Sequence, residues 1–347
     1  MIEETTLESI PVENNTQEHT VEKPENTKLP VVPQLVLLSA LLLLIFGSAL
    51  TPRVIALFDA GIPSEKSQPA QTVTATESEN GSAEKSFEEV ALTAKSAYVF
   101  DIQAQKALFK KNESQELPLA SITKLMTALV AEEILGEKET ITIGGISLKQ
   151  DGGSGFREGE EVKRQTLSDM VLMSSSNDGA YALASSAGSA LNLQGDSAST
   201  FVDAMNIRAK EIGLHNTYFK NPTGLDLGNG EAGAYGSARD VAFLMEYIVK
   251  NESDILAFTK ENAARFYSET GEYHDAENTN DYVNKIPGLI GSKTGYTDLA
   301  GGNLVVAWNA GLGRPMVAVV LGSTREERFT DIMKLVNGVA TLNTQTN

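Results

Sequence analysis

One uncharged segment divides this chain before any other feature can be interpreted. Residues 29–50, LPVVPQLVLLSALLLLIFGSAL, contain no charged side chain over 22 positions. As a helix rising about 1.5 Å per residue, the segment spans the roughly 30 Å hydrocarbon core of a bilayer. We therefore expect residues 29–58 to form a single N-terminal transmembrane helix with its flank. A signal peptide cleaved after Ala49 is the alternative, but the long apolar run and the acidic segment before it favour an uncleaved anchor.

The segments on either side of this span lack the apolar residues that a core needs. Residues 1–28 hold seven glutamates and two lysines and predict a disordered acidic tail. Residues 59–88 are rich in Ser, Thr, Glu, Pro and Gly without apolar periodicity, which is typical of a flexible linker. One folded domain is therefore expected at residues 89–347. Lysines and arginines are balanced near the two ends of the span, so they do not set its orientation.

Composition excludes several classes of function. The chain has no cysteine, which excludes disulfides and thiolate zinc sites, and its three histidines are too few for a histidine zinc site. We therefore predict no metal and no cofactor. A net charge of −18 argues against nucleic acid as a partner, because phosphate binding needs basic patches.

The folded part shows strand patterns at both ends and helical patterns between them. Together they predict a mixed α/β fold: an antiparallel sheet built from the two ends, covered by helices, with a helical lobe inserted in the middle. The expected elements are a hairpin at 96–112, a buried helix at 119–135, helices within 167–212 and at 241–249, strands from 288 onward and a final helix at 325–342.

Serine chemistry without histidine is the first indication of function. A Ser-His-Asp triad would need His215 or His274 as its base, and no Gly-x-Ser-x-Gly turn accompanies either histidine. Ser121-Ile-Thr-Lys124 lies instead at the start of the predicted buried helix, where a three-residue offset puts hydroxyl and amine on one face. Lys124 can then accept the proton of Ser121 if burial lowers its pKa.

Two later motifs carry matching chemistry. Ser175-Ser176-Asn177 lies between two helical stretches and presents a hydroxyl and a carboxamide. Lys293-Thr294-Gly295 lies on a predicted strand and offers a cation and a hydroxyl beside a glycine that allows close backbone approach. Together with the Ser121 motif they predict an acyl-transfer site that holds an anionic substrate terminus at Lys293.

Each motif alone has a simpler explanation. Ser121 alone suits a helix cap and Lys124 a surface lysine. Ser82-Ala83-Glu84-Lys85 also fits the first pattern, yet it lies in the predicted linker. The order and placement of all three motifs therefore carry the argument.

In these motifs the chain resembles the D-alanyl-D-alanine carboxypeptidases, which are low-molecular-mass penicillin-binding proteins. The likeness extends over about residues 92–340 through PLASITKLMTALVA, MSSSNDGAYALA, NPTGLDLGNGEAGAYGSARDVAFLM, GSKTGYTDLAGGNLV and LGSTREERF. It implies a β-lactamase/DD-peptidase-like fold and Ser121 as the acylated nucleophile. Lys124 would be its base, and Ser175 would relay a proton to the leaving amine.

The resemblance also implies the substrate-binding residues. Asn177 would hydrogen-bond the substrate, while Lys293 and Thr294 of the Lys-Thr-Gly295 motif would bind its terminal carboxylate. The backbone N–H groups of Ser121 and Tyr296 would form the oxyanion hole. Arg239 would support carboxylate binding, with a structural ion pair to Asp240 as the alternative reading of that arginine.

The implied activity is removal of the terminal D-Ala from peptidoglycan stem peptides, a step in cell-wall biogenesis and cell shape, with β-lactams as covalent inhibitors. Three alternatives share the motifs: a DD-endopeptidase, a β-lactamase, and a non-catalytic sensor of β-lactam or wall peptide. Because the substrate lies outside the cytoplasmic membrane, the resemblance places the domain at 89–347 outside and the tail at 1–28 inside. Ser176 departs from the glycine that relatives often carry, which leaves the geometry of that turn open.

Overall fold

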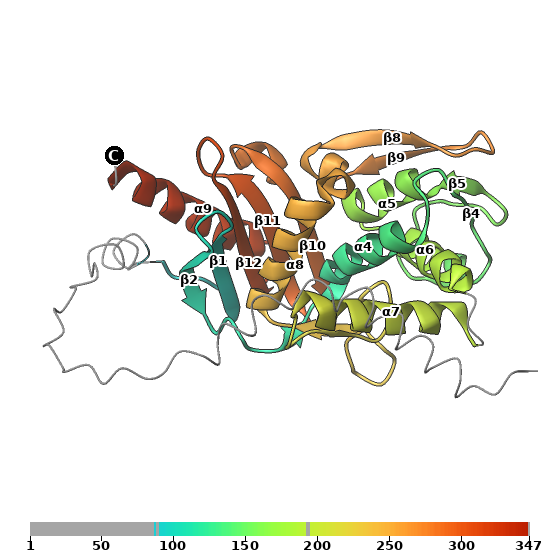
Figure 1. The fold of residues 1–347 in the computed structure, drawn as a ribbon, viewed down its shortest axis with the longest axis horizontal. Coiled ribbons are helices and arrows are strands. Elements are labelled where there is room, and N and C mark those ends of the chain that lie inside the picture. The colour runs from blue at the N-terminus through green and yellow to red at the C-terminus, as the bar shows by residue number, and fades with distance from the viewer. Residues whose placement is uncertain (1–86, 88–89, 192–194, 346–347) are drawn as a thin grey trace, which may run out of the picture. The chain divides into compact units, whose positions relative to one another are not determined.

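A computed structural model describes residues 87, 90–191 and 195–345 (Figure 1). The predicted tail, the predicted transmembrane segment and nearly all of the predicted linker lie outside these residues. Within the described part of the chain, no helix combines the length and the apolar character needed to cross a membrane.

A five-stranded antiparallel sheet joins the two ends of the folded domain, as the sequence predicted. Its strand order is β10-β11-β12-β1-β2, so the last strand of the sequence pairs with the first. Ser96 lies opposite Leu321, and Asp101 lies opposite Met316. The strands are β1 (Ser96–Asp101), β2 (Lys106–Lys111), β10 (Leu289–Thr297), β11 (Gly301–Asn309) and β12 (Pro315–Ser323).

Both faces of the sheet are covered because its central strands are apolar on both sides. Along β12, Val317 and Val319 pack into one core cluster, whereas Ala318 and Val320 pack into the other. This alternation follows from successive strand side chains pointing to opposite faces. Helix α9 (Glu327–Gln345) covers one face, and α8 (Ala238–Asn251) covers the other (Figure 1).

The helical lobe continues from the face that α8 covers. It contains α4 (Lys124–Ile134), α5 (Arg164–Met173), α6 (Asn177–Ala190) and α7 (Ser197–Ile212). The predicted helix at 119–135 is confirmed only from Lys124 onward. Before it, residues Ala120–Thr123 form the 3-10 helix η2, because Ala120 has a positive φ of 48° and cannot continue an α-helix.

Several small elements were not predicted from the sequence, because their strands are short and mix charged with apolar residues. A three-stranded sheet contains β3 (Leu117–Pro118), β7 (Ala234–Gly236) and β6 (Tyr218–Phe219). Two ribbons pair β4 (Thr140–Thr142) with β5 (Glu161–Lys163), and β8 (Ala263–Tyr267) with β9 (Tyr273–Glu277). The remaining 3-10 helices are η3 (Ser147–Lys149), η4 (Ser253–Lys260) and η5 (Val283–Lys285).

A buried carboxyl in the lobe opposes folding at neutral pH. Asp169 on α5 is 5% exposed and accepts one hydrogen bond from the Gln165 side chain. Burial raises its pKa to about 7 from an ordinary value of 3.8, although Gln165 and Arg164 act in the opposite direction. The folded state keeps a proton that the unfolded chain has already released, so stability falls as the pH rises from about 4 to about 7.

We therefore expect Asp169→Asn to stabilise the protein at pH 8, by up to about 4 kcal/mol, because the amide keeps the bond to Gln165 without a charge. The gain should shrink as the pH falls towards 4. Urea unfolding across this pH range measures it, with Asp203→Asn at an exposed position of α7 as the control. A gain of constant size from pH 4 to pH 8 would contradict the assignment.

Candidate active site

Ser121 lies in a turn that is held from several directions. It is the second residue of η2, and the residue before it, Ala120, is in the left-handed region. The amide of the Asn303 side chain on β11 donates to the carbonyls of Pro118 and Leu119, at 2.9 and 3.0 Å. A non-glycine residue with positive φ persists only where its surroundings enforce it. The serine is therefore presented by a strained backbone rather than by the first turn of an α-helix.

Lys124 lies within hydrogen-bond distance of Ser121. Its Nζ is 2.8 Å from Ser121 Oγ, 2.6 Å from Asn177 Oδ1 and 2.8 Å from the carbonyl oxygen of Thr223. A neutral amine can donate to Asn177 and Thr223 and still offer its lone pair to the serine hydroxyl. Burial lowers the pKa of Lys124 to about 7, although the nearby Asp178 carboxylate acts in the opposite direction. A large fraction of this amine is therefore neutral at physiological pH.

The second motif lies in the turn between α5 and α6. Ser175 adopts a positive φ of 64°, and Ser176 follows as the N-cap of α6, accepting from Gly179 N at 3.0 Å. The hydroxyl of Ser176 thus satisfies a helix end, which explains how a serine is accommodated in this turn. Asn177 donates through Nδ2 to the carbonyl of Asp151 at 2.5 Å, so its amide is held at both ends.

Lys293 on β10 is fully buried behind the second motif. Its Nζ donates to Ser175 Oγ at 3.0 Å and to the carbonyl oxygen of Thr294 at 2.9 Å. Burial lowers its pKa well below the usual range, and the charges of Lys124 and Arg328 add to this effect. Lys293 therefore acts on the site through Ser175 and Thr294, and it is not among the residues that line the cleft.

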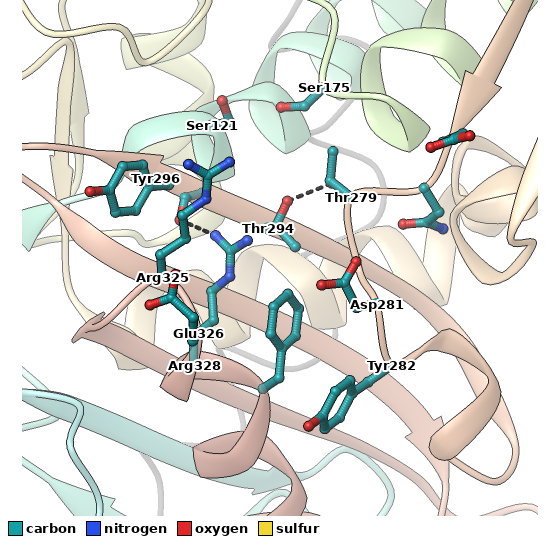
Figure 2. A pocket seen from close by; sticks show the side chains of 14 residues that line it. Ser121, Ser175, Thr279, Asp281, Tyr282, Thr294, Tyr296, Arg325, Glu326 and Arg328 are labelled. Carbon is teal, nitrogen blue, oxygen red and sulfur yellow. Dashed lines mark hydrogen bonds between the residues drawn. The ribbon is translucent and has the colours of Figure 1, made fainter.

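A cleft of about 660 Å³ opens over the two serines (Figure 2). Thr294 lies at its centre, and its hydroxyl is 2.5 Å from that of Thr279. The lining carries two arginines and three carboxylates, which are Arg325, Arg328, Glu277, Asp281 and Glu326. The full lining is Ser121, Ser175, Glu277, Asn278, Thr279, Asp281, Tyr282, Thr294, Gly295, Tyr296, Arg325, Glu326, Arg328 and Phe329.

The two arginines of the cleft were not predicted as site residues. Arg325 precedes α9, and its guanidinium lies 5.2 Å from the centre of the Tyr296 ring. Arg328 donates through Nη1 to the carbonyl of Gly295 at 2.9 Å, and burial lowers its pKa to about 10, with the charge of Arg325 contributing. The sequence feature that could have identified them is a pair of arginines three residues apart, directly after the last strand. They give the cleft a cationic end beside Thr294.

Arg239 lies elsewhere, so its predicted contribution to the cleft is not found. Its side chain is exposed at the start of α8 and stacks on Phe243 at 5.1 Å. The alternative pairing with Asp240 is not found either, because that carboxylate accepts from Asn216 N at 2.6 Å and from the Thr217 hydroxyl at 3.0 Å. Arg239 and Asp240 are adjacent in sequence, but consecutive side chains of a helix point in different directions and do not face each other.

Two glycines allow the backbones around Ser121 to approach one another. A Cβ on Gly295 would lie 3.2 Å from Ser121 N and 2.8 Å from the carbonyl oxygen of Leu119, so β10 lies directly against the serine turn. Gly224 has a φ of 79°, and a Cβ there would lie 1.9 Å from the carbonyl oxygen of Ala120. Both positions therefore exclude any side chain.

We expect Gly224→Ala to destabilise the protein by about 3 kcal/mol or more, because it adds both a steric clash and left-handed strain. The displaced Ala120 carbonyl should also move Ser121 away from Lys124. Urea unfolding measures the first effect and a crystal structure of the variant the second. Gly228→Ala is the matched control, since a Cβ at Gly228 meets nothing within 4 Å. Equal stability of the two variants would contradict this role for Gly224.

Comparisons with known proteins agree with this geometry. Residues 82–325 match the sequence profile of the family described as D-alanyl-D-alanine carboxypeptidase. The D-alanyl-D-alanine carboxypeptidase DacF of Bacillus subtilis is 33% identical to this chain. The alignment covers 73% of this chain and 64% of the length of DacF. A D-alanyl-D-alanine endopeptidase of Pseudomonas aeruginosa is 31% identical, over 70% of this chain and 76% of the relative.

Solved structures show the same fold. A D-alanyl-D-alanine carboxypeptidase of Mycobacterium tuberculosis superposes with a TM-score of 0.63 at 26% identity, covering 72% of this chain and 91% of its own. A penicillin-binding protein of Listeria monocytogenes, determined with ampicillin bound, gives 0.61 at 28% identity, covering 72% and 98%. The chain therefore belongs to the D-alanyl-D-alanine carboxypeptidase family.

Proposed function

We propose that this chain is a serine-type D-Ala-D-Ala carboxypeptidase that removes the terminal D-Ala from peptidoglycan stem peptides. The observation that carries the proposal is the pairing of two serines with two buried lysines at one cleft. Lys124 Nζ lies 2.8 Å from Ser121 Oγ, and Lys293 Nζ lies 3.0 Å from Ser175 Oγ. Family membership supports the reaction type.

In the first half of the reaction, Lys124 accepts the hydroxyl proton of Ser121 as Oγ attacks the carbonyl carbon of the D-Ala-D-Ala bond. The backbone N–H groups of Ser121 and Tyr296 stabilise the oxyanion. Ser175 donates its proton to the departing nitrogen and is reprotonated by Lys124, so the net effect is transfer of the Ser121 proton to free D-Ala and Lys124 is neutral again. The bond from carbon to nitrogen breaks, and an ester on Ser121 remains.

In the second half, water attacks the ester and Lys124 again accepts a proton, which returns to Ser121 Oγ as the shortened peptide leaves. The terminal carboxylate of the substrate binds at the cationic end of the cleft, through the Thr294 hydroxyl and Arg325. Asn177 holds Lys124 and offers its amide to the substrate. Arg239 has no part in this scheme.

The same site accounts for β-lactams as covalent inhibitors, since they present a reactive amide and a carboxylate to Ser121 and Thr294. The Listeria relative with ampicillin bound supports this proposal. Outside the catalytic domain at 89–347, we propose that residues 29–50 anchor the chain in the cytoplasmic membrane. The linker at 59–88 would then hold the enzyme on the outer side, with residues 1–28 inside. The 22 uncharged residues support the anchor.

We expect the full-length protein to form a β-lactam adduct at Ser121 and to release D-Ala from a peptide that ends in D-Ala-D-Ala. Ser121→Ala should abolish both, because it removes the attacking oxygen. Mass spectrometry of the adduct and a D-Ala assay measure these outcomes. Ser82→Ala is the matched control, since Ser82 is the serine of the other Ser-x-x-Lys sequence.

Other results of this experiment separate the alternatives. Release of D-Ala only from cross-linked peptides would favour an endopeptidase, the activity named for the Pseudomonas relative. Rapid loss of the adduct by hydrolysis would favour a β-lactamase. A stable adduct without any peptide cleavage would favour a sensor, and no adduct at Ser121 would contradict the proposal.

The rate of acylation should depend on pH through Lys124. Only the neutral amine can accept the Ser121 proton, and its pKa is about 7. The second-order rate constant should therefore rise between pH 5 and pH 8 with a midpoint near 7. In Lys124→Arg the rate constant of acylation should fall by about 10²-fold or more, because a guanidinium has no neutral form in this pH range. Stopped-flow acylation by a chromogenic β-lactam measures both, and a flat profile would contradict Lys124 as the base.

A further inference from the structure

A second cleft of about 510 Å³ lies beside the β8–β9 hairpin, outside the catalytic cleft. The hairpin contributes one wall, and residues 154–157 contribute the other. The side chains that the argument uses are Ser154, Arg157, Glu272, Tyr273, His274 and Asp275. The reaction scheme uses none of them.

The inner side of the hairpin fixes the shape of this cleft. Phe266 and Ala276 are buried, and the Phe266 ring lies 5.0 Å from that of Phe258. His274 Nε2 is 2.6 Å from Glu160 Oε1, and the His274 ring packs against Phe156 at 4.5 Å. The hairpin is thus attached both to the lobe and to the loop opposite, so the cleft is a built feature of the fold.

The outer side of the hairpin exposes aromatic surface. Tyr273 is 57% exposed and lines the cleft, whereas its cross-strand partner Tyr267 is 63% exposed and does not. Single exposed tyrosines are common, but the Tyr267 and Tyr273 rings lie 6.5 Å apart and form one exposed aromatic surface at the edge of the cleft. A tyrosine that is apolar on its ring face and polar at its tip suits a ligand with the same mixture.

The charges around the cleft are balanced. Arg157 lies 3.8 Å from Glu272, and Arg265 holds both oxygens of Asp275, at 2.6 and 2.8 Å. Each arginine therefore already pairs with a carboxylate, so the cleft has no uncompensated charge that would favour a charged ligand. Its planar polar side chains can still exchange hydrogen bonds with a neutral ligand that carries many hydroxyl or amide groups.

The loop that forms one wall also contacts the catalytic motif. Ser154 N donates to Asp178 Oδ2 at 2.6 Å, and a Cβ on Gly152 would lie 3.0 Å from Asn177 Nδ2. Two residues of extended chain span at most about 7 Å, so the second cleft begins close to Asn177. The loop of residues 152–154 therefore contacts the catalytic motif and also lines the second cleft.

We propose that this second cleft binds the glycan chain to which the stem peptide is attached. The proposal rests on the proposed function, because it assumes a peptidoglycan substrate. A sugar ring is neutral and presents C–H groups on its faces and hydroxyl or acetamido groups at its edge. The Arg265 guanidinium covers one face of the Tyr273 ring, 4.3 Å from the ring centre, and the ring remains 57% exposed. The sugar face packs on the other face of Tyr273, and the edge groups bond to Arg157, Glu272 and Ser154.

The test compares two substrates with one stem peptide, either free or attached to its glycan, using the full-length protein. We expect Tyr273→Ala to raise KM for the glycan-linked substrate about tenfold and to leave kcat, and both constants for the free peptide, unchanged. Arg157→Ala should act in the same direction. Tyr218→Ala is the control, since it removes an exposed tyrosine that lines neither cleft, whereas Tyr267 contacts the Tyr273 ring and is unsuitable.

A direct titration separates failure of this proposal from failure of the proposed function. Soluble oligomers of N-acetylglucosamine, followed by NMR, should shift the signals of residues 154–157 and 272–275 in the wild type and not in Tyr273→Ala. Wild-type shifts that Tyr273→Ala removes would support the cleft even if no D-Ala were released. A KM for the glycan-linked substrate that stays at the wild-type value in Tyr273→Ala, or sugar shifts that Tyr273→Ala does not change, would overturn the proposal.

Discussion

Two lysines without solvent exposure determine the chemistry of this protein. Taking an ammonium group out of water is costly, so burial favours the neutral amine at both positions. The pKa of Lys124 is about 7, and the pKa of Lys293 is lowered well below its usual value by burial and by the charges of Lys124 and Arg328. The remaining N–H groups are satisfied by Asn177, Thr223, Ser175 and the Thr294 carbonyl. Because the fold keeps water away from Lys124 and Lys293, their amines lose a proton more readily than those of exposed lysines and can act as bases.

This burial depends on three backbones meeting closely. Strand β10 lies against the Ser121 turn because Gly295 has no side chain, and the Ala120 carbonyl lies against Gly224 for the same reason. Asn303 joins β11 to the residues just before Ser121 and also accepts from Gly322 N on β12. The sheet, the lobe and the 219–233 connection therefore hold one another in place. A substitution at any of these contacts should therefore displace the Ser121 hydroxyl.

The cleft carries both cationic and acidic side chains. Arg325 and Arg328, with Glu326 beside them, lie on one side of Thr294, and Asp281 lies on the other (Figure 2). A carboxylate bound at Thr294 would therefore be attracted to the side that carries the two arginines. The loop that carries Gly152 and Ser154 contacts Asn177 and Asp178 and also lines the second cleft, which we propose binds the glycan.

The sequence alone determined the parts of the molecule that depend on local spacing. A three-residue offset predicted the Ser121–Lys124 contact, and apolar periodicity predicted the central sheet and most of the lobe. The 3-10 turn at Ala120 escaped prediction, because a left-handed alanine is imposed by its surroundings rather than by its own preference.

Only the tertiary structure decided how the distant parts meet. Lys124 and Thr223 are 99 positions apart and Lys293 and Ser175 are 118, and no local rule relates them. For the same reason the sequence suggested Arg239 while the fold places Arg325 in the cleft. Residue type and spacing set the chemistry that is available, but packing decides which groups lose their water and which anions or hydroxyls they face.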